Sequence, residues 1–219
     1  MRRDNLNISL DIKANNHIEK AWETFTDYGD IGTDTVRQVI SHGWLKSREL
    51  GIQPDTERAQ TVISSDEVEE KVKTEDLGQA GISVLEGLSD ILHDTQHVVV
   101  LADASVRILY SIGHKQIQDN LERINFRPGG AWSEKDVGPN GVGTPLALGR
   151  PEIVMGHEHY CKGWHPWVCY GAPIYDISGK SIKGSIDITG QVKQINKEAM
   201  VMAITLAQSV QSGVSLIQY

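Results

Sequence analysis

Histidine and cysteine side chains gather in one short stretch, at spacings that could hold a metal ion. His157, His159 and Cys161 alternate along the chain, so an extended backbone would place them on one face. His165 and Cys169 follow closely enough to complete a set of four ligands. These spacings match neither the C-x-x-C nor the H-x-x-x-H pattern of common metal sites. A metal or haem site is therefore one interpretation; the favoured one is that the histidines line, or hydrogen-bond around, an organic ligand.

The two cysteines allow a further interpretation. Cys161 and Cys169 could form a reversible disulfide that reports oxidation, provided that a neighbouring charge such as Lys162 or His165 makes one thiolate reactive. Two cysteines eight positions apart do not make the disulfide framework of a small secreted protein. In a reducing cytosol they would stay thiols.

Three tryptophans crowd into the same part of the chain. Trp132, Trp164 and Trp167 are large apolar side chains, and each carries one ring N–H that can donate a hydrogen bond. Ligand sites are lined by aromatic residues with a few directed polar groups, so this crowding favours a pocket wall over plain core packing. The polar groups of such a pocket would be His159, Tyr160 and His165.

Two other segments have simpler interpretations than chemistry. The stretch Asn140-Gly141-Val142-Gly143-Thr144 lacks the lysine of a phosphate-binding loop, so it predicts a helix start that Asn140 caps. Asp187 alternates with apolar neighbours, and an unpaired buried carboxylate is costly. We therefore expect Asp187 to have a buried partner or to face solvent. No G-x-S-x-G elbow or comparable nucleophile is present.

Predicted strands and helices must position these residues. Apolar alternation and turn residues predict strands over 97–102, 107–112, 152–155, 167–175 and 182–189. Helical periodicity predicts helices over 17–28, 33–50, 116–123, 140–148 and 196–218, and one long helix that Ser65 or Asp66 caps and that runs towards His93. Residues 1–15 lack periodicity and are expected to be a mobile end. This order predicts an α+β layer with one face of the sheet covered by helices.

The bulk composition excludes several classes of protein. The net charge is −8 and no basic cluster exceeds Arg2-Arg3, so direct contact with nucleic acid is not expected. Apolar runs such as 98–102 are the length of a strand, so no membrane span is expected. The N-terminus has no apolar segment of a secretory signal, which predicts a cytoplasmic protein.

Six motifs in chain order resemble the GAF sensor of acetoin-regulator-type activators of sigma-54 RNA polymerase. They are Trp132-Ser133-Glu134, Asn140-Gly141-Val142-Gly143-Thr144, His157-Glu158-His159-Tyr160-Cys161, Trp164-His165-Pro166-Trp167-Val168-Cys169, Ala172-Pro173-Ile174 and Gly184-Ser185-Ile186-Asp187-Ile188-Thr189-Gly190. Upstream, Trp44, Ser47, Gly51 and Pro54 resemble the S-W-x-R-S-x-x-x-G-x-x-P signature of the same family, with Gly43 and Lys46 as departures from it.

The resemblance implies an α+β fold with a GAF-like antiparallel sheet, helices on one face and an N-terminal helical region. It divides the chain into a helical leader, 1–64, and a GAF domain with flanking dimerisation helices, 65–219. It implies a homodimer without a cofactor, binding a small organic effector, a ketone, hydroxyketone or alcohol. The implied ligand-binding residues are Tyr110, Trp132, His159, Tyr160, Trp164, His165, Trp167 and Cys169.

The family continues into an AAA+ ATPase and a helix-turn-helix. The chain lacks a G-x-x-x-x-G-K-[ST] loop, so we expect a non-enzymatic regulatory fragment with both of those domains absent. The alternatives are a metal, haem or thiol redox sensor, and a GAF-type methionine sulfoxide reductase whose cysteine pattern the chain does not match.

Overall fold

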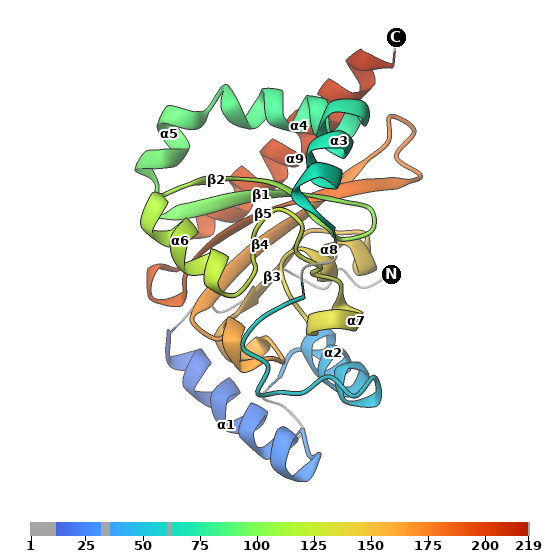
Figure 1. The fold of residues 1–219 in the computed structure, drawn as a ribbon. Helices are drawn as coiled ribbons and strands as arrows, with labels where there is room; N and C mark the ends of the chain where they lie inside the picture. Colours follow the sequence, from blue (N-terminus) through green and yellow to red (C-terminus); the bar gives the residue numbers. More distant parts are fainter. Residues whose placement is uncertain (1–11, 32–35, 61–62, 219) are drawn as a thin grey trace.

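A five-stranded antiparallel sheet forms the centre of the molecule, with the strand order β2-β1-β5-β4-β3. The structure, a computed structural model, describes residues 12–31, 36–60 and 63–218 (Figure 1). The strands are β1 (His97–Asp103), β2 (Ile108–Gly113), β3 (Glu152–Met155), β4 (Trp167–Tyr175) and β5 (Ile182–Gln191). The five predicted strands are confirmed to within two residues at either end.

Both faces of the sheet are covered. All of β1 is buried, and its residues alternate between two separate apolar clusters. Val99 and Leu101 contribute to the first cluster, whereas Val98 and Val100 contribute to the second. Because successive side chains of a strand point to opposite faces, the two clusters are the two sides of the sheet.

The first face is covered by helices that flank the sheet in sequence. Figure 1 shows α4 (Asp76–Glu86) and α9 (Lys197–Ile217) above the sheet, with α3 (Ser65–Thr74) and α5 (Ser89–Asp94) beside α4. Ala203, Leu206 and Val210 of α9 are buried in this cluster. Helices cover this face, as expected, and the second face carries helices as well.

The predicted single helix towards His93 was wrong, because the chain breaks into α3, α4 and α5. Ser64, rather than Ser65 or Asp66, caps α3 in a reciprocal capping box with Glu67. Glu75 has extended backbone angles and ends that helix. Gly78 then lies against the backbone of α3, where an added Cβ would come within 2.6 Å of Val72 Cα.

The helix α9 is apolar enough to cross a membrane by length and composition alone. No such segment was expected from the sequence; apart from Lys197 and Glu198, the polar side chains of α9 are uncharged. One helix of this kind among the described residues is weak evidence, since a core helix passes the same test. The packing of α9 against the sheet and α4 accounts for its apolar inner face.

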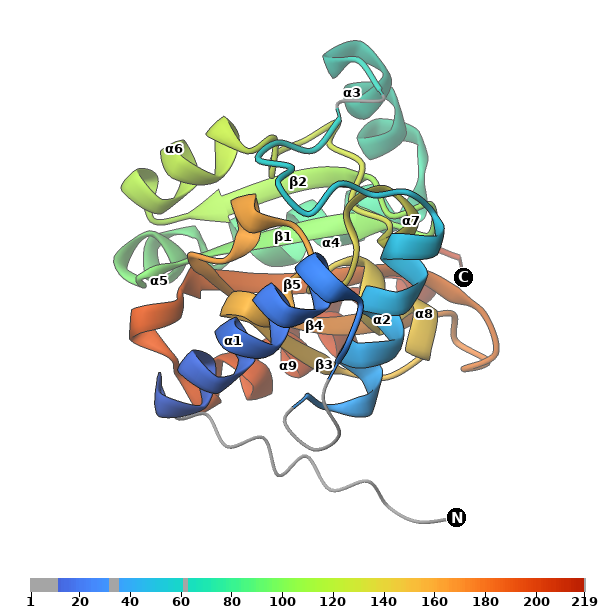
Figure 2. The ribbon, with the colours of Figure 1, turned by 90° about the horizontal axis from the view of Figure 1, so that it is seen from below.

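The second face is covered by the N-terminal helices and by the segments between β2 and β4. Figure 2 shows α1 (Ile12–Tyr28) and α2 (Gln38–Glu49) in front of the sheet. Three further helices follow, α6 (Lys115–Arg123), α7 (Glu134–Val137) and α8 (Gly143–Leu148), with the short turns η1 (Gly156–Glu158) and η2 (Lys162–Trp164). A third turn, η3 (Val192–Gln194), precedes α9.

Two predicted boundaries at the N-terminus change. Residues 12–15 are helical, so the described part of the expected mobile end belongs to α1, and residues 1–11 lie outside the described residues. The helix predicted over 33–50 begins at Gln38; positions 32–35 are also outside the described residues.

The N-terminal helices pack into the second cluster. Phe25 of α1 stacks on Trp44 of α2, with ring centroids 5.7 Å apart, and both side chains are fully buried. The indole nitrogen of Trp22 donates to the carbonyl oxygen of Tyr160 at 2.8 Å, and that of Trp44 donates to the carbonyl oxygen of Glu158 at 2.9 Å. The leader is thus bound directly to the segment that contains the histidines.

A buried ion-pair cluster strengthens this attachment. Arg37, just before α2, reaches Glu158 Oε1 with Nε at 2.8 Å and Glu152 Oε1 with Nη1 at 2.6 Å. It also donates to the carbonyl oxygen of Ile153 at 2.6 Å. Because both glutamates are almost fully buried, Arg37 compensates Glu158 of η1 and shares the compensation of Glu152 of β3 with Arg150, which lies 3.1 Å from Glu152 Oε2. The leader, 1–64, and the predicted GAF domain, 65–219, are therefore joined by hydrogen bonds, ion pairs and one shared apolar cluster.

Candidate functional site

Trp132 and Trp164, two of the predicted tryptophans, form a tryptophan wall on the second face of the sheet. The ring centroids of Trp132 and Trp164 are 4.7 Å apart, and Phe126 packs edge-on against Trp132 at 4.6 Å. The indole nitrogen of Trp132 donates to the carbonyl oxygen of Asn125, and that of Trp164 donates to the carbonyl oxygen of Val137. Since their ring N–H groups are already used, these two residues can offer a ligand apolar contact.

Trp167 and the two predicted tyrosines occupy different surroundings. Trp167 contributes to the same apolar cluster but also lines a hollow of about 360 Å³ at the end of β5, beside Gln191 and Lys193. Tyr160 packs edge-on against Phe25 of the leader. Burial raises the pKa of the Tyr160 phenol.

Tyr110 is not brought together with the other predicted residues. It packs against the first cluster, and its hydroxyl lies 3.3 Å from Glu86 of α4. There it lines a separate hollow of about 770 Å³ with residues of α3. The structure therefore places Tyr110 on the opposite side of the sheet from the tryptophan wall.

A buried polar network lies on the same face as the tryptophan wall. His159 Nε2 is 3.6 Å from Cys169 Sγ, Thr189 Oγ1 is 3.3 Å from that sulfur, and Thr189 Oγ1 is 2.5 Å from Asp187 Oδ2. All four side chains are almost completely buried. His159 Nδ1 lies 2.9 Å from the carbonyl oxygen of Gly156, so Nδ1 carries the proton and Nε2 is left to accept from the thiol.

Burial keeps this network near neutral charge. It raises the pKa of Asp187 to about 7, although hydrogen bonds from Thr189 and the Tyr170 backbone act in the opposite direction. Burial also lowers the pKa of His159 to about 4. The pKa of the Cys169 thiol is raised by burial and by the neighbouring Asp187. A neutral cluster of donors and acceptors suits an uncharged polar ligand.

Thr189 and Asp187 are not among the site residues predicted from the sequence. The expectation that Asp187 has a buried partner is confirmed by Thr189. The alternation of Asp187 with two core isoleucines was the signal that it faces the other side of the sheet. No sequence pattern pairs it with a cysteine and a histidine from other elements.

The glycine-rich segment forms a roof over the network. Asn140 Oδ1 accepts from the amides of Val142 and Gly143, each at 2.9 Å, and Thr144 lies in the first turn of α8. The helix begins at Gly143, three residues after the predicted start, although Asn140 binds the amides at its beginning, as expected of a capping side chain. Neither amide is left free for a phosphate. Gly141 must be glycine, since an added Cβ would lie 2.1 Å from Asp187 Oδ1.

Asn140 also joins two sequence motifs. Its Nδ2 donates to the carbonyl oxygen of Trp132, and the hydroxyl of Thr144 donates to Glu134 Oε1 at 2.7 Å. The W-S-E and N-x-x-G-T motifs are therefore one hydrogen-bonded unit. Through Asn140, this unit holds both Trp132 of the tryptophan wall and the glycine-rich roof in position.

The geometry gives little support to a redox or metal centre. Cys161 and Cys169 are free and buried, and burial raises the pKa of the Cys161 thiol to about 12. A reactive thiol requires the opposite shift. Within the described residues, no three His, Cys, Asp or Glu side chains are grouped as a metal site requires.

His157 and His165 belong to the contact with the leader. Their rings are 4.1 Å apart, and Trp22 of α1 packs edge-on against His165 at 4.7 Å. His165 Nε2 lies 3.2 Å from the carbonyl oxygen of His159. Burial lowers the pKa of His165 to about 3. His165 therefore links the leader to the residue that begins the polar network.

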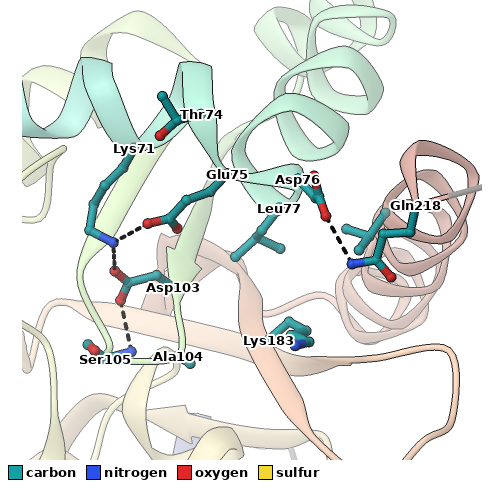
Figure 3. Close-up of a pocket in the computed structure, with 11 residues that line it drawn as sticks. Lys71, Thr74, Glu75, Asp76, Leu77, Asp103, Ala104, Ser105, Lys183 and Gln218 are labelled. Atoms are coloured by element: carbon teal, nitrogen blue, oxygen red, sulfur yellow. Dashed lines mark hydrogen bonds and ion pairs between the residues drawn. The ribbon is translucent and has the colours of Figure 1, made fainter.

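A further hollow, of about 390 Å³, lies where α3, α4 and α9 meet the turn after β1. Figure 3 shows the polar side chains that line it. Lys71 Nζ lies 2.7 Å from Glu75 and 3.2 Å from Asp103, and Gln218 donates to Asp76 at 2.9 Å. Lys71 is thus paired with the carboxylates of Glu75 and Asp103. The hollow has the character of a contact between helices.

Comparison with known proteins places the chain among transcriptional regulators. The model of the family "MimR, N-terminal domain" matches residues 14–214. The acetoin dehydrogenase operon transcriptional activator AcoR of Bacillus subtilis is 29% identical over 171 residues, which are 78% of this chain and 28% of AcoR. The propane 2-monooxygenase operon transcriptional activator MimR of Mycolicibacterium smegmatis is 29% identical over 186 residues, 84% of this chain and 31% of MimR. The chain thus spans about a third of these relatives.

A solved structure shows the same fold. In the complex of Escherichia coli DhaR(N) with DhaL, the matching chain has a TM-score of 0.75 and 16% sequence identity, over 83% of this chain and 62% of that one. The expected GAF-like α+β fold and the resemblance to acetoin-regulator-type activators are confirmed. The relatives are regulators, in agreement with the expectation of a non-enzymatic region. The chain belongs to the family of MimR N-terminal domains.

Proposed function

We propose that this chain is the effector-sensing region of a sigma-54-dependent transcriptional activator and that it binds a small ketone, hydroxyketone or alcohol. The observation that carries the proposal is the neutral network of His159, Cys169, Thr189 and Asp187 on the same face as the tryptophan wall. Sites for small molecules combine apolar walls with a few placed polar groups. The names of the relatives, which include an activator of an acetoin dehydrogenase operon, support a small oxygenated effector.

The attachment of the leader suggests how binding is transmitted. The segment from Glu158 to His165 contacts both the polar network and the leader, through Trp22 and Trp44. An effector that displaces His159 would therefore change the contacts of α1 and α2. Such a response requires that the effector bind one arrangement more tightly than the other.

We also propose that the protein is a homodimer that joins through α9. Val201 and Leu216 are exposed on this helix, at 65% and 80%, and α9 has no charged residue after Glu198. An uncharged exposed helix face favours burial against a second copy. Following the family resemblance, we place the full-length protein in the cytoplasm, with an AAA+ ATPase and a helix-turn-helix beyond this region.

Native mass spectrometry with elemental analysis tests the proposal. Purified protein is measured alone and with acetone, acetoin or 2-propanol. A saturable mass increase of one organic molecule per chain, without metal, is expected. Stoichiometric iron or zinc would support the metal-sensor alternative, and the absence of any bound ligand would contradict the proposal.

Alanine variants locate the site within the same assay. His159→Ala and Cys169→Ala, which remove members of the polar network, are expected to lose effector binding while the circular dichroism spectrum is unchanged. Tyr110→Ala is the matched control, because Tyr110 lies on the other face of the sheet. Retained binding in both test variants would remove these two residues from the site.

A further inference from the structure

One oxygen of the buried network has no hydrogen-bond partner. Asp187 is fully buried, and its Oδ2 is bonded to Thr189. The Tyr170 backbone is close enough to favour the ionised carboxylate, but no group of the described residues meets hydrogen-bond geometry at Oδ1. Buried polar groups are almost always hydrogen-bonded. An unpartnered carboxyl oxygen in the interior therefore requires an explanation.

The neighbours of Asp187 cannot supply the missing partner. Gly171 is directly opposite on β4 and has no side chain. Ser185 lies two residues earlier on the same face of β5. Its hydroxyl donates to the carbonyl oxygen of Val142 at 3.3 Å, so its proton is not available to Asp187. Gly141 lies over Oδ1 and presents only its backbone. A donor to Oδ1 must come from outside these groups.

The direction of the network decides which chemical group is missing. Thr189 has one hydroxyl proton, which can go either to Asp187 Oδ2 or to Cys169 Sγ. When Asp187 is protonated, Thr189 donates to the sulfur and its oxygen accepts the carboxyl proton from Oδ2, so Oδ1 remains an acceptor. An ionised carboxylate is also an acceptor at Oδ1. In either state the matching ligand atom is a hydrogen-bond donor, such as an alcohol hydroxyl. A ketone oxygen has no proton to give.

We propose that Asp187 is a specificity-determining residue, whose Oδ1 accepts a hydrogen bond from a hydroxyl group of the effector and so selects alcohols and hydroxyketones over plain ketones. The inference rests on the proposed function, since it concerns the same site. Sites built to hydrogen-bond a substrate hydroxyl discriminate strongly against analogues without one, because a buried group is then left unpaired. The roof at Gly141 is the backbone next to this oxygen, so ligand entry requires the roof to move.

Matched ligand pairs test the inference on the intact chain. Isothermal titration calorimetry compares acetoin with butane-2,3-dione, and 2-propanol with acetone; the members of each pair differ only by the two hydrogen atoms of the hydroxyl form. The hydroxyl compound is expected to bind at least about tenfold more tightly in at least one pair. Equal affinities would overturn the inference and assign Oδ1 to a buried water molecule. A preference for ketones would overturn it by showing a proton on Oδ1.

A variant pair separates the inference from the proposed function. Asp187→Asn is expected to lose the preference for the hydroxyl compound, whereas Ser185→Ala, on the same strand and face, keeps it. Circular dichroism and thermal unfolding establish that both variants fold. If wild-type protein binds all four compounds without preference, the inference fails and the proposed function stands. If it binds none of them, both fail.

Discussion

The buried carboxyl of Asp187 gives a pH dependence of stability that can be worked out from the structure. Burial raises the pKa of Asp187 from 3.8 to about 7 in the folded protein. Between these two values the unfolded chain has released the proton, while the folded chain still holds it. Protons bound more tightly by the folded state make stability fall as pH rises. The stabilising contribution of the raised Asp187 pKa to the free energy of unfolding is therefore fully present below pH 3.8. It declines between pH 3.8 and about pH 7 and is lost above that.

The magnitude follows from the two pKa values. A difference of one pKa unit corresponds to about 1.4 kcal/mol. Between pH 5 and pH 8 the contribution of Asp187 to the free energy of unfolding should fall by about 2 to 3 kcal/mol. Asp187→Asn keeps the shape of the side chain and removes its titration. The free energy of unfolding of wild type minus that of the variant should decline by this amount over the same range.

Urea denaturation at half-unit steps from pH 5 to pH 8 measures this difference. The histidines titrate in both proteins, so their contributions cancel in the subtraction. Asp176→Asn is the matched control: hydrogen bonds in its exposed turn lower the pKa of Asp176 to about 2, below the measured range. A wild-type-minus-variant difference that is independent of pH, or that rises with pH, would refute the assignment of a buried, neutral Asp187.

Three further changes test other parts of the structure. Gly141→Ala should lower the free energy of unfolding by about 1 to 3 kcal/mol in urea titrations, because the new methyl group overlaps Asp187; an unchanged midpoint would contradict the tight roof. Arg37→Met should cost about 3 kcal/mol by leaving Glu158 without a cation and Glu152 with Arg150 alone, whereas Lys46→Ala, whose ion pair is 3.9 Å long, should change little; equal effects would refute the role of the buried cluster. Iodoacetamide at pH 8 should modify Cys161 about a thousandfold more slowly in the native protein than in urea, and rapid native labelling would revive the redox alternative.

Local sequence patterns predicted the sheet well because each strand carries its own signal. The strand β4 is a continuous apolar run bounded by Pro166 and the turn at Asp176, and its predicted ends coincide with the observed ones. The start of α8 was also predictable to within three residues, since Asn140 and two glycines act within a few residues of one another.

Features that depend on distant partners were not predictable in the same way. Arg37 pairs with glutamates 115 and 121 residues away, and no local pattern marks it as a buried cation. The position of Tyr110 depends on a register shift between Leu101 and Ala102 in the pairing of β1 with β2, which disturbs simple alternation. The break at Glu75 follows from α4 packing against α3 rather than from helix propensity.

The polar network contains both residues that local sequence motifs predict and contacts that only the folded sheet creates. The sequence motifs placed His159 and Cys169 in the site, because both lie within the segment that resembles the family pattern. The meeting of Cys169 with Thr189 is set by the register of β4 on β5, where these two residues are paired. That register, and with it the contact to Asp187, is a property of the folded sheet.

The most direct test of the account is a titration of labelled protein followed by NMR of its indole N–H signals. The chain has five tryptophans, and their signals can be assigned by single substitutions. On addition of acetoin, the signals of Trp132 and Trp164 should shift saturably and with the same dissociation constant. If both signals stay unchanged while calorimetry detects binding, the effector binds elsewhere and the proposed site is wrong.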